Sequence, residues 1–162
     1  MKIFGKPLTE YAAFSKLFLW LIAIFGIARL GMSLAGVSNS TAKWFSMTVV
    51  TLVGLLYYSI RVHTSGFGSY KQLLPITFWM SVVAQGIAVV AIVLSIVTAH
   101  DNIFSAPEYS GGGDGKNWLH VFAHVVVGLI IEPLFLWLVG CVLMFVAKKV
   151  APKQQDAAAA NA

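Results

Sequence analysis

The sequence predicts an all-α integral membrane protein, folded as a four-helix bundle of transmembrane segments. Of its 162 residues, 59% are hydrophobic and 10% are charged, and the mean hydropathy is +0.83. A soluble domain has about a quarter of its residues charged, so a chain this poor in charge cannot cover itself with polar surface. The lipid bilayer is therefore its expected surroundings.

Four apolar stretches are long enough to cross a bilayer, which takes about 20 residues of helix. They occupy residues 14–35, 44–62, 76–99 and 118–147. Segments rich in Gly, Pro and polar residues end them, as short connections do. We expect a single four-span domain over residues 1–150 with an up-down-up-down course, followed by a disordered cytoplasmic tail at residues 151–162.

The basic residues indicate the orientation of the spans, because Lys and Arg favour the cytoplasmic side. Most of them fall at one end of the predicted bundle: Lys2, Lys6, Lys16, Arg61, Lys71, Lys148, Lys149 and Lys153. The other end receives Lys43 and Lys116 beside three acidic residues: Asp101, Glu108 and Asp114. We expect both termini in the cytoplasm, and the protein in a bacterial inner membrane.

The first span has a second interpretation as a cleaved signal peptide. A basic start precedes an apolar run, and Ser33 and Ala35 form a small-x-small cleavage pattern. Glu10 ahead of the run and Arg29 within it fit that pattern poorly. The four-span interpretation is therefore preferred.

Charge and cysteine content exclude several functions. The net charge of +5 does not indicate nucleic-acid binding, because the basic residues are scattered singly and form no basic-aromatic patch. Cys141 is the single cysteine, so neither a disulfide framework nor a cysteine-based metal site is available. No Ser–His–Asp or Cys–His set can be assembled at one depth. A protein without its own catalytic set is the favoured interpretation.

Small residues recur on one face of the third span, at three- and four-residue steps: Ser81, Ala84, Ala88, Ala91 and Ser95. In lipid, small side chains mark the surfaces where helices approach closely. We expect these residues to form a helix-packing seam. Gln85 borders the seam and could hydrogen-bond across it.

The fourth span carries titratable side chains on one ridge. His120, His124, Gly128 and Glu132 follow each other at four-residue steps, so they share one side of a helix that drifts slowly around its axis. His120 should lie at the outer headgroup level and Glu132 near mid-bilayer. Because polar groups are costly in lipid, the ridge should face protein or water.

Arg29 in the first span is the expected partner of Glu132. Arg29 lies about 20 Å from the cytoplasmic end of its helix and Glu132 about 24 Å from the end of its own. Intramembrane charges are usually paired or functional, so we expect an intramembrane ion pair. Pro133 frees a backbone carbonyl near Leu129, and a kink there would widen the bundle beside the carboxyl group.

Three histidines are expected near the outer surface, and two cofactors are open to them. His100, His120 and His124 could bind a divalent metal ion, since imidazole is the commonest side-chain ligand. Alternatively, His100 and His124 could supply the two axial ligands of haem b from different helices. His120 and His124 cannot both bind one haem from a single helix face.

Three functions follow from these residues. The leading interpretation is a non-catalytic accessory or structural subunit of a larger membrane assembly, or of a homo-oligomer, because packing seams dominate and soluble parts are very short. The first alternative is a haem- or metal-binding electron-transfer subunit that uses the outer histidines. The second is a proton or ion pathway along His120, His124 and Glu132.

Overall fold

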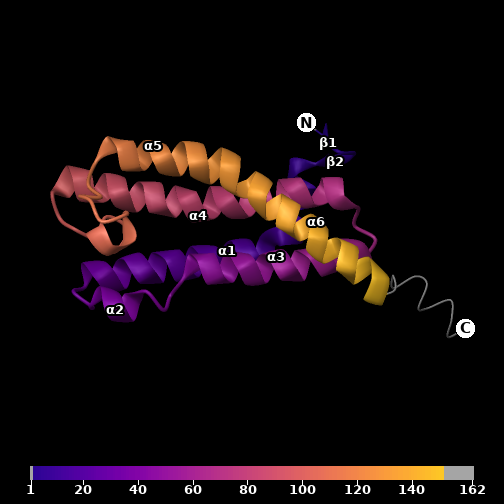
Figure 1. Ribbon diagram of the computed structural model, residues 1–162, viewed down its shortest axis with the longest axis horizontal. Coiled ribbons are helices and arrows are strands. Elements are labelled where there is room, and N and C mark those ends of the chain that lie inside the picture. The colour runs from indigo at the N-terminus through magenta and orange to yellow at the C-terminus, as the bar shows by residue number, and fades with distance from the viewer. Residues whose placement is uncertain (1, 152–162) are drawn as a thin grey trace, which may run out of the picture.

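The computed structural model describes residues 2–151 and consists of four long helices packed as a bundle (Figure 1). The first is α1 (Leu8–Leu34), the second is α3 (Met47–Thr64) after the single turn α2 (Asn39–Ala42), and the third is α4 (Tyr70–Thr98). The fourth comprises α5 (Trp118–Val126), the π-helical turn η2 (Val127–Ile131) and α6 (Glu132–Val150). Each of the four is long and apolar enough to span a membrane, which confirms the predicted class.

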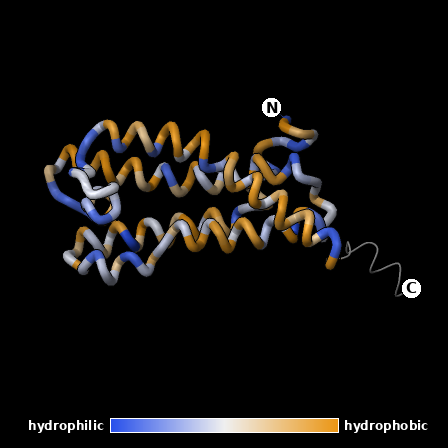
Figure 2. The backbone as a smooth tube through the Cα atoms, viewed as in Figure 1, coloured by the Kyte–Doolittle hydropathy of each residue, from blue (hydrophilic) through white to orange (hydrophobic). Residues whose placement is uncertain are grey.

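Hydrophobic residues run along all four helices, and hydrophilic residues gather mainly at the connections (Figure 2). Large apolar side chains such as Trp20, Ile27, Phe135 and Val142 point outward and are more than half exposed. Such a surface implies contact with lipid, because proteins surrounded by water rarely expose apolar patches of this extent. Residues 152–162, which include most of the predicted tail, lie outside the described part of the chain.

Both described ends of the chain lie at the same end of the bundle, and the 99–117 connection lies at the opposite end (Figure 1). The sequence analysis did not anticipate a small antiparallel hairpin, β1 (Lys2–Ile3) and β2 (Lys6–Pro7), before the first helix. The Tyr11 hydroxyl donates to the carbonyl of Ile3 at 2.8 Å. The side chain of Gln72 donates to the carbonyl of Phe4 at 2.9 Å. These bonds tie the hairpin to α1 and α4.

Side-chain caps explain where several helices begin. The Ser46 hydroxyl accepts from the amide of Val49, and the Asn117 side chain accepts from the amide of His120. Both caps satisfy backbone donors that a helix start leaves without intrahelical partners. Ala99 adopts a left-handed conformation with φ 57°, which ends α4 as a C-terminal cap does.

Helix α4 is the centre of the bundle and contacts each of the other long helices. The small residues of its seam are all buried, at 6% exposure or less: Ser81, Ala84, Ala88, Ala91 and Ser95. On the facing helix α1, Gly26 has no room for a side chain, because an added Cβ would lie 2.9 Å from Ile87. The backbones of α1 and α4 therefore approach closely along this seam, as small residues in membrane helices permit.

The connection after α4 folds back into the bundle instead of staying on its surface. Asn102 is buried and donates to the carbonyl of Ala91 and to the Ser95 hydroxyl, both at 2.7 Å. The amide of Ile103 donates to the Ser33 hydroxyl of α1 at 2.8 Å. These bonds hold Phe104 and the following 3-10 turn η1 (Pro107–Tyr109) against the outer ends of α1 and α4.

The half of the bundle nearer the chain ends is packed with apolar side chains. Its fully buried or nearly buried members come from three helices: Leu55, Leu73, Ile76, Met80, Leu136 and Met144. A Cβ added to Gly140 of α6 would lie 2.6 Å from Leu73 and 2.9 Å from Leu55. Helices α3, α4 and α6 are thus in tight contact in this half.

The fourth helix changes its neighbours along its length. Its outer part, α5, packs against α4, whereas α6 packs against both α4 and α3. The change follows the turn η2, which ends directly before Glu132 and Pro133. Proline has no amide hydrogen and disturbs the preceding turn, so the disruption expected at Pro133 takes the form of a π turn. It leaves α5 apart from α3.

Candidate functional site

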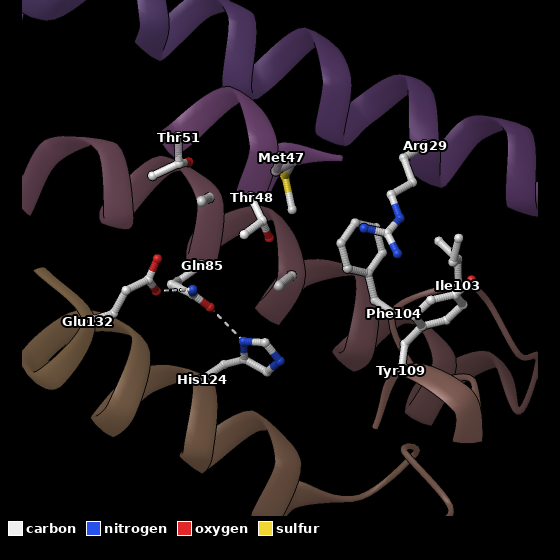
Figure 3. A pocket seen from close by; sticks show the side chains of 12 residues that line it. Arg29, Met47, Thr48, Thr51, Gln85, Ile103, Phe104, Tyr109, His124 and Glu132 are labelled. Atoms are coloured by element: carbon white, nitrogen blue, oxygen red, sulfur yellow. Dashed lines mark hydrogen bonds between the residues drawn. The ribbon is translucent and has the colours of Figure 1, made fainter. Parts of the chain in front are cut away.

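A polar cavity of about 260 Å³ lies in the outer half of the bundle (Figure 3). All four long helices and the inserted connection contribute side chains to it. The polar and aromatic members are Arg29, Thr48, Thr51, Gln85, Phe104, Tyr109, His124 and Glu132. A cavity with this lining inside a membrane bundle is unusual, because polar groups at membrane depth are costly and tend to be functional.

Three lining side chains, together with His120 beside them, form an unbroken hydrogen-bonded chain. The imidazole of His120 contacts that of His124, with the two Nε2 atoms 3.2 Å apart. The Nδ1 atom of His124 lies 2.5 Å from Oε1 of Gln85, and the amide nitrogen of Gln85 donates to Glu132. We call this series, His120–His124–Gln85–Glu132, the relay. The relay places a carboxyl group from inside the bundle in hydrogen-bonded contact with the outer end.

The π turn explains why Glu132 shares a face with the two histidines. In a regular α-helix each residue turns the chain by about 100°, so Glu132 would lie about 80° around the axis from His124, eight residues earlier. A π turn accommodates one additional residue. With one residue absorbed in the π turn, Glu132 lies roughly 20° around the axis from His124, on the opposite side from the 80° position. The turn therefore aligns Glu132 with His124 toward Gln85 on α4.

The orientation of the Gln85 amide decides where the protons of the relay lie. The Nδ1 atom of His120 lies 3.0 Å from the carbonyl of Gly115, and that of His124 faces the amide oxygen of Gln85. With the amide in this orientation both oxygens accept, so both Nδ1 atoms would carry hydrogen. A hydrogen bond between the two Nε2 atoms would add a third hydrogen and give the pair a charge of +1, which an ionised Glu132 would balance through Gln85.

Arg29 and Glu132 line the same cavity, yet they do not form the predicted ion pair. Among residues 2–151 the ion pairs are Lys6–Glu10 and Lys116–Asp101. Figure 3 shows Arg29 at one end of the cavity and Glu132 at the other. Arg29 lies nearer the outer ends of the helices than Glu132, contrary to the expected similar depth, and the two side chains have different partners. Glu132 is held by Gln85, and Arg29 lies against two aromatic rings.

The three histidines do not come together as a metal site. No group of three His, Cys, Asp or Glu side chains suited to a metal ion occurs in residues 2–151. His100 is exposed, and its Nδ1 atom bonds back to the carbonyl of Thr98 at 2.8 Å. The left-handed Ala99 directs it away from the fourth helix. The structure therefore gives no support to metal binding by His100, His120 and His124.

The haem alternative fits no better. The Nδ1 atom of His124 is engaged by Gln85, and its Nε2 atom by His120. His100 turns back on its own helix end. The arrangement therefore does not present His100 and His124 as opposed axial ligands of one haem.

Several residues of the site escaped the sequence analysis. Gln85 was expected to bond across the helix seam, but its two partners on the fourth helix were not foreseen. Phe104 and Tyr109 lie in a connection without regular periodicity, and no sequence signal places them beside Arg29. Thr48 on α3 was also missed.

The outer connection, which supplies Ile103, Phe104 and Tyr109 to the cavity, also carries charged side chains. A hydrogen bond of 2.8 Å from Asn39 lowers the pKa of the Glu108 carboxyl group. A hydrogen bond to Asp101 raises the pKa of Lys116. Glu108 and Asp101 therefore have partners other than Arg29.

Comparison with known proteins adds no assignment to this geometry. No protein-family model, curated protein or solved structure matches the chain.

Proposed function

We propose that this chain is an integral membrane protein that transfers a proton between its outer surface and Glu132 inside the bundle. The relay carries the proposal, since it connects four side chains without a gap from the outer end to the carboxyl group. Chains of titratable side chains in membrane helices are typical of proton-conducting sites. The apolar packing below Glu132 limits the described path to one side of the bundle.

The relay has two hydrogen-bonded arrangements that hold the same number of protons. In the first, the two imidazoles share three N–H protons and Glu132 is ionised. In the second, the Gln85 amide is turned over, so that its nitrogen donates to His124 and its oxygen accepts from a protonated Glu132. His124 then donates through Nε2 to His120, which keeps its proton on Nδ1. Three protons are present in each arrangement, and the net charge of the relay is zero in both.

Passage between the two arrangements moves one proton from the imidazole pair to Glu132. The Nδ1 proton of His124 passes to the amide oxygen of Gln85 while an amide proton of Gln85 passes to Glu132, so the O–H bond of Glu132 forms as one imidazole N–H bond is lost. The imidic acid left on Gln85 returns to the amide as the side chain turns over, which restores a donor on one side and an acceptor on the other. The exchange needs no co-reactant.

The proposed orientation places both ends of the chain in the cytoplasm and the cavity toward the outside. The distribution of Lys and Arg supports it, because most of them lie at the end that holds the terminal hairpin. The inner membrane of a bacterium is the proposed location. Protons then enter the relay from the outer aqueous phase at His120.

The proposal can be tested by infrared difference spectroscopy on protein reconstituted in lipid vesicles. Acidification of the outer solution should add a fourth proton to the relay, which recharges the imidazole pair after its own proton has passed to Glu132. This uptake should produce a signal from a protonated carboxyl group with slow hydrogen–deuterium exchange. Glu132→Gln should remove this signal, and Gln85→Leu should slow its appearance. Glu108→Gln is the matched control, because Glu108 is an exposed carboxyl group at the same end. A slow-exchanging signal that persists in Glu132→Gln would contradict the proposal.

A second candidate function is that of an accessory subunit in a larger membrane assembly or homo-oligomer. It is supported by α5, none of whose residues is buried. Trp118, Leu119 and Phe122 are each more than 60% exposed, so α5 offers an apolar face that lipid or another subunit can cover. Cross-linking of Phe122→Cys in a Cys141→Ser background tests this candidate. A product of one chain in native membranes would count against it.

A further inference from the structure

Arg29 is a cation without a counter-charge among the described residues. Its guanidinium carbon lies 5.1 Å from the ring centre of Phe104 and 5.2 Å from that of Tyr109. These are cation–π distances. The Nε atom is inaccessible and has no hydrogen-bond partner within residues 2–151. Aromatic rings fix the orientation of the guanidinium group but accept few of its five N–H donors.

The charge balance of the cavity isolates Arg29 further. In both arrangements of the relay the charges of the imidazole pair and Glu132 sum to zero, so Glu132 is not available to neutralise Arg29. No acidic side chain of the outer connection pairs with Arg29: Glu108 accepts from Asn39, Asp101 pairs with Lys116, and Asp114 accepts from the amide of Lys116. Arg29 therefore has no ion-pair partner among residues 2–151, and a cation in low dielectric favours an anion beside it.

We infer that the cavity binds an oxyanion, a phosphate or a carboxylate, through the guanidinium group of Arg29. The planar fork of arginine matches two oxygens of such a group. The hydroxyl of Thr51 also lines the cavity; its oxygen is inaccessible and without a hydrogen-bond partner in the described structure. Thr48 lies between Thr51 and Arg29 (Figure 3) and can donate to a further oxygen of the anion.

The volume of the cavity agrees with a ligand of this size. Its 260 Å³ corresponds to roughly nine water molecules at about 30 Å³ each. A phosphate or carboxylate group with a few waters fits this space, whereas an entire lipid does not. Any acyl chains would have to remain outside the cavity.

The depth of Arg29 allows two sources of the anion. Arg29 lies five residues before the end of α1, about 7–8 Å along the helix axis, where lipid headgroups are within reach. The ligand is therefore either the headgroup of an anionic lipid or a free anion from the outer solution. The chemistry recognised by Arg29 is the same in both cases.

Titration calorimetry on the purified chain in mild detergent tests this inference without involving proton transfer. The probes are inorganic phosphate, acetate and a short-chain phosphatidic acid, with a short-chain diacylglycerol as the uncharged reference. Binding of any of the three anions should be roughly tenfold to a hundredfold weaker in Arg29→Gln, because a bond to a charged group is lost. Arg61→Gln is the matched control, since Arg61 is an exposed arginine at the other end.

A second variant guards against misfolding of Arg29→Gln. Thr48 is exposed and lines the cavity, so Thr48→Phe should fold and exclude the anion by filling space. Binding of phosphatidic acid alone would identify a lipid headgroup, and binding of phosphate or acetate would identify a free anion; both outcomes support the site. Absence of binding, or binding unaffected by Arg29→Gln and Thr48→Phe, would overturn it.

Discussion

The Nδ1 atom of His124 lies 2.5 Å from the side-chain oxygen of Gln85, which joins the fourth helix to the central helix at the level of the cavity. The same amide bonds Glu132 through its nitrogen. One side chain on α4 thus fixes two titratable groups on either side of the π turn. This link and the packing around the cavity lead to four predictions that can be checked on the purified protein.

Gln85→Leu should destabilise the bundle by about 1–3 kcal/mol. The substitution preserves most of the side-chain volume but leaves His124 and Glu132 without the amide that satisfies them. Thermal unfolding in detergent, followed by circular dichroism, measures the loss. An unchanged midpoint would show that the two groups find other partners.

Gly128→Ala should disturb the relay, whereas Gly86→Ala should be tolerated. A Cβ at Gly128 would lie 2.6 Å from Cγ and Cδ of Gln85, but a Cβ at Gly86 meets nothing within 4 Å. Overpacking costs about 1–3 kcal/mol, while replacing glycine in an open helix position gains about 0.5–1 kcal/mol. The two variants should therefore shift the unfolding midpoint in opposite directions. Equal shifts would contradict the close approach of Gly128 to Gln85.

Arg29→Gln and Glu132→Gln should have additive effects on the free energy of unfolding. The two residues have different partners and do not contact each other, so their coupling should stay within about 0.5 kcal/mol. A direct ion pair would instead make the double variant much less damaged than the sum of the single variants. Reversible unfolding of all four proteins in a double-mutant cycle distinguishes these cases.

Asn102→Leu should be among the most destabilising changes in the outer half, at about 2–4 kcal/mol. It removes the bonds to Ala91 and Ser95 and the acceptor for the amide of Phe104. Ser65→Ala is the control, because Ser65 is exposed at the other end of the bundle and its loss should cost about 0.5 kcal/mol or less. Limited proteolysis of the 99–117 connection should report its release in the first variant alone.

The fold was accessible from the sequence because the bilayer imposes simple rules. Long apolar runs such as the one between Tyr70 and Thr98 can satisfy their backbone in lipid only as helices, and small residues on one face mark the packed side. The terminal hairpin was not predictable, since it depends on contacts of Ile3 and Phe4 with residues distant in the chain.

The site was accessible only in part. The four-residue spacing placed His120 beside His124, but the estimate of similar depth for Arg29 and Glu132 was wrong, because Arg29 lies nearer the outer ends of the helices. The angle at which each side chain leaves its helix could not be deduced, because the π turn rotates everything beyond Val127 relative to a regular helix. The link through Gln85 depends on the register between α4 and the fourth helix. The spacing of side chains within one segment gives no information about that register.

The apolar packing of Leu55, Leu73, Met80 and Leu136 has an electrical consequence. If the proposed relay operates, a proton that reaches Glu132 crosses part of the transmembrane voltage, and this apolar packing hinders the rest of the crossing. A full crossing is worth about 2.3 kcal/mol per 100 mV, and passage to mid-depth roughly 1 kcal/mol per 100 mV. Occupancy of Glu132 would then follow the membrane potential as well as external acidity, and the bundle would sense an energised membrane without discharging it.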